Sequence, residues 1–166
     1  LFPMMVETAK RLKSSDGDLK FEVPAASAKL AEQIRGLMAE AGAGELIAVT
    51  TGGSHSLMQR AGCAVVASGT ATLESAYYGL PYCLVYRVAP LTYLLARMLV
   101  KIEHIGLVNI LAGEGVVEEL IQAKAEPVSV ARSWAPFSRC WSRSACACPS
   151  ALWPRSTWKS LLPRTA

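Results

Sequence analysis

The alternation of apolar and polar positions along the chain predicts a regular succession of strands and helices. Short apolar or alternating runs typical of strands cover residues 19–23, 45–50, 62–67 and 81–88. Apolar residues at helical spacing predict helices over residues 2–13, 27–41, 54–61, 71–78, 90–100 and 116–123, with a loop over 104–109. The helix over 27–41 has Leu30, Ile34 and Leu37 on one side, which we expect to be buried.

This order of elements predicts an α/β fold. Repeated strand–helix–strand units are typical of a Rossmann-like domain, in which helices cover both faces of a parallel sheet. The run GCAVVA at 62–67 is continuously apolar, as expected of a strand buried on both faces. A length of 166 residues is enough for one such domain and too short for two ordinary ones.

Composition divides the chain at about residue 127. The first 127 residues hold all 13 acidic residues and 11 of the 17 Lys and Arg. Residues 128–166 hold six cations, no acid and all four tryptophans, without sustained apolar periodicity. We therefore predict a domain over 1–127 and an irregular, basic tail over 128–166 that is disordered or frame-shifted. A nucleic-acid partner is not expected, because no nucleic-acid-binding motif accompanies these cations.

Cysteine spacing and apolar run lengths argue against other protein classes. Cys63 and Cys83 lie in apolar runs, and Cys146-x-Cys148 lacks the spacing and histidine partners of a zinc site. We expect reduced cysteines and no bound metal. The longest apolar runs fall short of the ~20 residues that a bilayer span requires. The chain opens without a signal-peptide pattern or an initiator Met, so we expect it to begin inside a longer protein.

The segment Ala67–Glu74 carries the clearest candidate chemistry. It lies where a buried strand ends and a helix begins, which is the edge where open α/β sheets bind ligands. Gly69 permits close backbone approach, and the N–H groups of a first helical turn favour a diphosphate. Glu74 lies one turn after Thr70, where a carboxylate suits the paired hydroxyls of a ribose. The alternative is a common small-residue turn in which Ser or Thr merely caps the helix.

Five motifs in a fixed order extend this interpretation. The chain carries, in succession, SGTATLE (68–74), GLP (79–81), YRVAPLTY (86–93), GLVNILAG (106–113) and EELIQ (118–122). This string resembles the C-terminal domain of the lipid-A-disaccharide synthase family over about residues 1–126. Val108 and Glu118 depart from the family pattern, which usually has Pro at both positions.

The resemblance implies one half of a GT-B fold, in which two Rossmann-like domains face each other across a cleft. The family is implied to be an inverting, metal-independent glycosyltransferase without a cofactor. It transfers 2,3-diacylglucosamine from its UDP conjugate to 2,3-diacylglucosamine-1-phosphate, a lipid acceptor. The resemblance also implies a cytoplasmic enzyme peripheral to the inner membrane of a Gram-negative bacterium, with homodimers known in the family. The general base belongs to the N-terminal domain, so we expect this chain alone to be inactive.

Several residues match the family's donor site. Asn109 matches an asparagine facing the cleft, which supports catalysis, and the other matches are Ser68, Gly69, Thr70 and Thr72 for the diphosphate, Glu74 for the ribose, and Glu119 and Gln122 as a polar pair on the last helix. Arg87, just past a strand end, is a candidate to neutralise the departing UDP or else a solvated surface cation. His55 resembles a histidine near a phosphate, although exposed loop histidines are more common.

Two other interpretations remain open from the sequence. A different UDP-sugar enzyme, such as another GT-B glycosyltransferase or an epimerase, would share the glycine-containing turn and the carboxylate but not the later motifs. A decayed gene product would fold in part and bind nothing. Titration with UDP distinguishes these classes.

Overall fold

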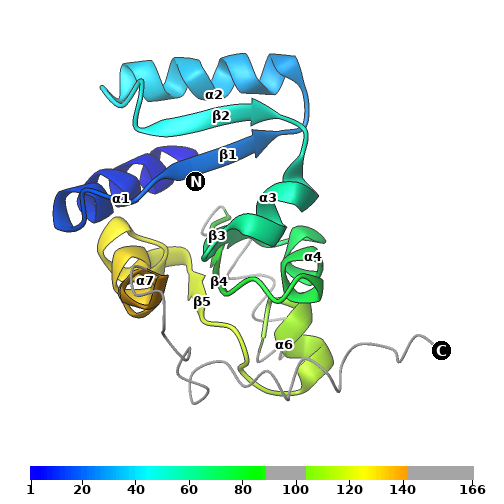
Figure 1. The fold of residues 1–166 in the computed structure, drawn as a ribbon. Helices are drawn as coiled ribbons and strands as arrows, with labels where there is room; N and C mark the ends of the chain where they lie inside the picture. Colours follow the sequence, from blue (N-terminus) through cyan, green and yellow to red (C-terminus); the bar gives the residue numbers. More distant parts are fainter. Residues whose placement is uncertain (89–103, 142–166) are drawn as a thin grey trace.

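The computed structural model describes residues 1–88 and 104–141, and its strands form two parallel sheets. Strands β1 (Phe21–Ala25) and β2 (Ile47–Thr51) form a two-stranded sheet. The second sheet has the order β3–β4–β5, with strands Ala64–Ala67, Tyr82–Tyr86 and Glu119–Ile121. The predicted α/β class with parallel strands is confirmed, although the strands in this part of the chain form two sheets (Figure 1).

The helices connect these strands in the predicted alternation. The elements are α1 (Phe2–Ser15), α2 (Ala28–Glu40), α3 (Ser54–Arg60), α4 (Ala71–Tyr77), α6 (Leu107–Ala112), the 3-10 helix η1 (Gln122–Lys124) and α7 (Pro127–Trp141). The helices predicted over 2–13, 27–41, 54–61 and 71–78 are confirmed to within two residues at each end. The helix predicted from Pro90 lies outside the described residues.

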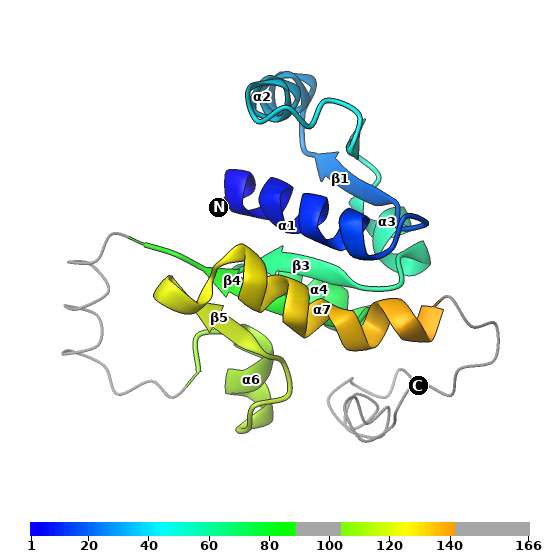
Figure 2. The same cartoon turned by 90° about the vertical axis from the view of Figure 1, so that its left-hand side faces the viewer.

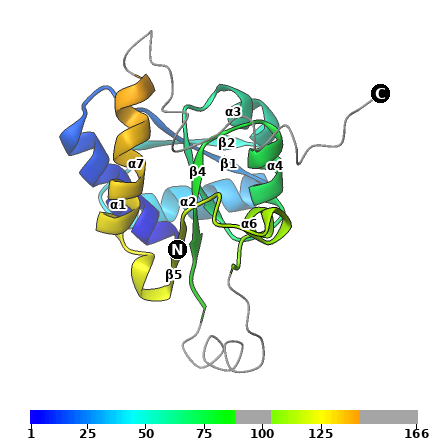
Figure 3. The same ribbon diagram turned by 90° about the horizontal axis from the view of Figure 1, so that it is seen from below.

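Strand β4 is the centre of the three-stranded sheet and is buried on both faces. Tyr82 and Leu84 pack in one cluster with residues of α4 and α6, whereas Cys83 and Val85 pack in another with Val130 of α7. Figure 3 shows the same layering, with α1 and α7 on one side of β4 and α4 and α6 on the other. Burial on both faces explains why this strand is an uninterrupted apolar run in the sequence.

Helix α2 covers the two-stranded sheet, with a face different from the one expected. Its buried residues are Ala31 and Met38, whereas Leu30 and Leu37 are 45% and 40% exposed. The apolar stripe is therefore rotated by one residue, since Ala31, Ile34 and Met38 also recur at helical spacing. The small Ala31 side chain allows the helix to approach the sheet closely, so packing selects it over the larger leucines.

The segment after residue 104 differs from the predicted loop and helix. Helix α6 begins at Leu107 inside the predicted loop, and β5 with η1 replaces the helix predicted over 116–123. Strand β5 pairs in parallel with β4, with Leu120 opposite Val85. This edge pairing overrides the helical spacing of Val117 and Leu120, both of which are buried.

Helix α7 occupies the first part of the segment predicted to be an irregular tail. Val130 is fully buried in the core beside Val85, and the Trp134 ring stacks on Phe21 at a centroid distance of 5.7 Å. Helix α7 also packs against α1 (Figure 2). The folded domain thus extends beyond the boundary predicted at residue 127. Residues 142–166 of the predicted tail lie outside the described part.

Two features are absent from residues 1–88 and 104–141. No helix there is long and apolar enough to cross a membrane. No group of three or more His, Cys, Asp or Glu side chains in these segments is placed to hold a metal ion.

Candidate functional site

The turn between β3 and α4 leaves the sheet at Ser68. The Ser68 N–H donates to the Val85 carbonyl oxygen at 3.2 Å, which is the last bond of this turn to β4. Gly69 follows with a φ of 152°, a positive value that L side chains rarely adopt. The Gly69 carbonyl then accepts from the Thr72 N–H at 3.2 Å, and α4 begins. Gly69 therefore allows the chain to reverse directly from strand into helix.

Thr72 holds this turn closed from the inside. Its side chain is completely buried, and its hydroxyl donates to the Gly69 carbonyl oxygen at 2.7 Å. Burial also raises the pKa of the neighbouring Tyr82 phenol, an effect that the Thr72 hydroxyl partly offsets. The predicted contact of Thr72 with a diphosphate therefore does not fit its position. Thr72 shapes the turn that would make such a contact.

The outer side of the turn carries free backbone donors. Gly69 and Thr70 are exposed, and nothing lies within 4 Å of a Cβ atom built on Gly69. Within the described segments, no hydrogen-bond acceptor faces the N–H groups of Gly69, Thr70 and Ala71. Successive free N–H groups at the start of a helix form an anion-binding arrangement. The geometry of the turn thus suits a phosphate or diphosphate.

Glu74 has a partner that the sequence did not identify. His55 Nε2 lies 3.2 Å from Glu74 Oε2, and the two side chains are 62% and 40% exposed. His55 lies in the first turn of α3, after Gly52 and Gly53, which both have positive φ. His55 is exposed, as expected of the commoner case, but it lies in α3 and contacts Glu74. The signal available in the sequence was its place in a glycine turn after a strand, like that of the Ser68–Thr70 turn.

Asn109 is buried in a separate polar cluster. It is 1% exposed and lies in α6 rather than in the predicted loop. Its Nδ2 donates to the Val117 carbonyl and to Glu119 Oε1, both at 2.8 Å, and its Oδ1 accepts from the Val117 N–H at 2.8 Å. Both amide donors and the oxygen are thus engaged within the chain, so this geometry leaves little of the amide for a ligand.

Glu119 is the centre of the same cluster and lies on β5, not on a helix. Its carboxylate accepts from the N–H groups of Ile105 and Gly106, each at 2.9 Å. A Cβ atom at Gly106 would lie 2.9 Å from Leu84 Cδ1 and 3.0 Å from Glu119 Oε1. Glycine at position 106 therefore makes room for the carboxylate to reach the backbone.

Gln122 fixes the end of β4. Its Oε1 accepts from the Val88 N–H at 2.8 Å, and its Nε2 donates to the Val88 carbonyl at 3.0 Å. Its φ of 51° is positive, which is uncommon for a residue other than glycine. Glu119 and Gln122 together hold the backbone at Ile105 and at Val88, on the two sides of residues 89–103.

The sequence that carries these features matches a known protein family. The family model for lipid-A-disaccharide synthetase matches residues 1–136. Curated lipid-A-disaccharide synthases of Geobacter sulfurreducens, Trichlorobacter lovleyi and Azotobacter vinelandii are 39%, 42% and 38% identical to the chain, and the alignments cover 79%, 79% and 82% of it. The chain belongs to the lipid-A-disaccharide synthase family. It spans about a third of the length of these relatives (34%, 34% and 36%).

The match to the lipid-A-disaccharide synthase family also bears on the C-terminal boundary. The family match ends at residue 136, inside α7, and not at residue 127. This agrees with the packing of Val130 and Trp134 against the body of the domain. The first turns of α7 are therefore family sequence, and any change in the character of the chain begins later.

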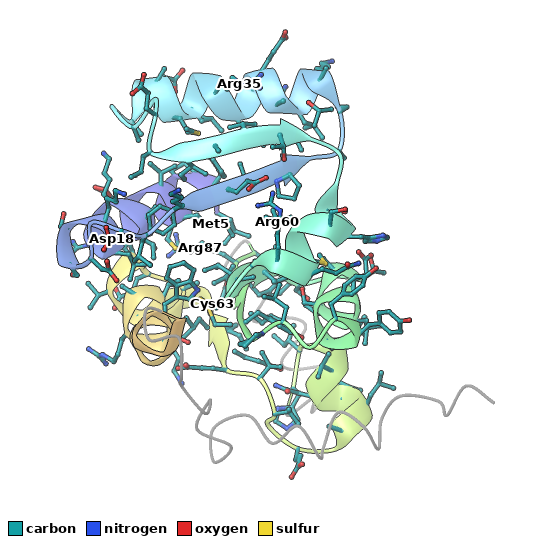
Figure 4. The ribbon with its side chains drawn as sticks, in the orientation of Figure 1. Met5, Asp18, Arg35, Arg60, Cys63 and Arg87 are labelled. Carbon is teal, nitrogen blue, oxygen red and sulfur yellow. The ribbon has the colours of Figure 1, made fainter. Side chains whose placement is uncertain are left out.

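Arg87 is not brought to the turn of this synthase-family domain. Its Nη2 donates to the Ala125 carbonyl oxygen at 3.0 Å, just before α7 begins. Figure 4 shows Arg87 near Met5, on the side of α1 and α7. The same view shows Arg60 beside β1, where it forms an ion pair with Glu22 at 2.6 Å. Both arginines thus fasten elements of the fold to one another.

Proposed function

We propose that this chain forms the UDP-binding part of a lipid-A-disaccharide synthase. The complete enzyme would transfer 2,3-diacylglucosamine from its UDP conjugate to 2,3-diacylglucosamine-1-phosphate in lipid A biosynthesis. Because the chain spans about a third of its relatives, the acceptor site and the general base would belong to the remainder of the enzyme. Family membership supports the reaction, and the turn at Ser68–Thr70 supports the donor site.

The free N–H groups of the β3–α4 turn carry this proposal. UDP presents a diphosphate, and backbone donors with the positive end of a helix dipole bind such groups well. Ser68 and Thr70 would add hydroxyl donors at the rim of the turn. Glu74, one turn further along α4, would accept a hydrogen bond from a ribose hydroxyl. Neutralisation of the departing diphosphate would then come from these N–H groups without a metal ion.

Asn109, Glu119 and Gln122 have a supporting role in the proposed site. Their side chains are bonded to the backbone of the same domain: Gln122 holds Val88 just past the carboxyl end of β4, whereas Asn109 and Glu119 hold the chain just before β5. We propose that they position β4 and β5 for the donor. Arg87 would act in the same indirect way, through its bond to Ala125.

The lipid substrates define the setting of the complete enzyme. Donor and acceptor both carry acyl chains, so we propose a glycosyltransferase that works at the cytoplasmic surface of the inner membrane of a Gram-negative bacterium, peripherally bound. Inversion at the anomeric carbon and homodimer formation are part of the same proposal, by family membership. The isolated chain should not form disaccharide, because GT-B chemistry takes place between two domains.

Calorimetric titration of the purified chain with UDP tests the donor site. We expect saturable binding that Glu74→Ala weakens roughly tenfold, because a charge-assisted hydrogen bond to the ribose is lost. Glu114→Ala removes an exposed carboxylate away from this turn and should leave binding unchanged. If the folded chain shows no binding at millimolar UDP, the proposed donor site is wrong.

A further inference from the structure

We propose that His55 is a positioning residue for Glu74 and that the two side chains form one ribose-recognition element. This inference rests on the proposed function, since it assigns a role within the same UDP site. It concerns a residue at the start of α3, outside the motifs that carry the family resemblance in this chain.

The pair joins two turns that are separate in the sequence. His55 lies at the start of α3, and Glu74 lies in the first turn of α4. The 3.2 Å contact between His55 Nε2 and Glu74 Oε2 is the one hydrogen bond of the Glu74 side chain within the described segments. Glu74 Oε1 is therefore left to accept from another donor, and a carboxylate with one oxygen fixed points the other in a defined direction.

The aromatic neighbour restricts the imidazole. The Tyr78 ring lies 5.7 Å from the His55 ring at an interplanar angle of 48°, and Tyr78 follows Glu74 by one helical turn. Glu74 on α4 and Tyr78, the C-cap residue of this helix, thus both contact His55. The pair remains accessible, because His55 is 62% and Glu74 is 40% exposed at the side chain.

The chemistry of UDP explains why a histidine beside Glu74 would favour binding. A carboxylate beside a diphosphate-binding turn disfavours the anion by charge repulsion. A histidine that donates to this carboxylate disperses its charge and leaves one oxygen for a ribose hydroxyl. An ordinary exposed ion pair has little effect on stability and none on ligand selectivity. Selectivity for the ribose therefore distinguishes the proposed role from a surface contact.

The test compares UDP with 2′-deoxy-UDP as calorimetric probes of the 166-residue chain. We expect His55→Ala to weaken UDP binding roughly fivefold, the typical effect of one hydrogen bond, and to reduce the preference for UDP over 2′-deoxy-UDP. His55→Gln should restore most of the UDP affinity and most of the preference for UDP, because the glutamine amide can also donate to Glu74. His104→Ala is the matched control and should change neither. Circular dichroism of each variant verifies that the fold is kept.

The outcomes separate the two proposals. If Glu74→Ala weakens UDP binding while His55→Ala leaves affinity and ribose preference unchanged, the role of His55 is refuted and the donor site stands. If His55→Gln fails as completely as His55→Ala in folded protein, donation to Glu74 is not what His55 supplies, and the inference is again refuted. If the wild-type chain does not bind UDP, the donor site and the role of His55 both fail.

Discussion

The β3–α4 turn and the cluster around Glu119 contrast in how they use their polar groups. Among the described residues, the N–H groups of Gly69 and Thr70 have no acceptor, and the buried Thr72 hydroxyl closes the turn. The cluster engages both ends of the Asn109 amide and both Glu119 oxygens within the chain. Both regions carry motifs of the same family, yet within residues 1–88 and 104–141 the turn leaves backbone donors without a partner, whereas the Asn109 amide is fully engaged.

This difference separates recognition from support. A buried polar group must find its partners within the protein, because leaving it unpaired costs about 1–3 kcal/mol. An exposed polar group can stay unpaired within the protein, because water forms hydrogen bonds with it until a ligand binds. Exposed side chains at the turn and in α4, such as Thr70 and Glu74, should therefore affect UDP binding with little effect on stability, whereas residues of the cluster should affect stability first.

The largest expected effect is that of Asn109→Ala on stability. The substitution removes the side-chain partner of the buried Val117 N–H and carbonyl groups and one of the three donors to the half-buried Glu119 carboxylate. We expect the free energy of unfolding to fall by about 3 kcal/mol, as measured by urea denaturation. Thr70→Ala in the exposed turn is the control and should stay within about 0.5 kcal/mol of wild type. Equal losses for the two variants would remove the contrast between the regions.

A smaller effect is expected for Gln122→Asn. Asparagine adopts positive φ more readily than glutamine, but its side chain is one methylene shorter and cannot reach both groups of Val88. We expect a net loss of about 1–2 kcal/mol in the same denaturation assay. Gln33→Asn on the exposed side of α2 controls for the change of residue and should cost about 0.5 kcal/mol. A neutral Gln122→Asn would mean that relief of backbone strain fully offsets the loss of the two hydrogen bonds.

The sequence was informative where the chain's own pattern decides the structure. Strands β3 and β4 are continuous apolar runs, and the small-residue turn after Ala67 could only be a strand-to-helix connection. Strand β5 was missed for two reasons. Val117 and Leu120 stand at helical spacing, and the strand has three residues that are defined by their pairing with β4, which the local sequence does not reveal. The face of α2 was missed for a similar reason, since packing against the sheet favoured the small Ala31.

Some residues of the candidate site could be placed from the sequence, whereas their contacts could not. Gly69 and Thr70 could be placed at the turn because a strand end and a helix start flank them. The His55–Glu74 contact links residues that are 19 positions apart and depends on how α3 packs beside α4. The inward role of Asn109 and Glu119 depends on the close approach at Gly106, which a motif alone does not reveal.

The smallest expected effect per residue is that of the buried thiols, which lie in the sheet region between the two clusters of polar groups. Burial raises the pKa of Cys63 to about 12 and that of Cys83 to about 11, with a further rise for Cys63 from the neighbouring Cys83. In the unfolded chain both thiols ionise near pH 9. The unfolded state therefore loses protons first as the pH rises. This contribution to stability is complete below pH 9 and declines up to about pH 11 for Cys83 and about pH 12 for Cys63.

We expect each thiol to lower the free energy of unfolding by about 1 kcal/mol between pH 9 and pH 10. A Cys63→Ala, Cys83→Ala double variant should show a correspondingly shallower decline, and an identical pH dependence would contradict the burial of these groups.

The reactivity of Cys83 also tests the contrast between the turn and the Glu119 cluster. At pH 8, alkylation of Cys83 followed by peptide mass analysis should be slow in wild type and in Glu74→Ala, but faster in Asn109→Ala. The reason is that Leu84, the neighbour of Cys83 on β4, pairs with Glu119, so loss of the cluster loosens the strand, whereas loss of a ligand contact at the turn does not.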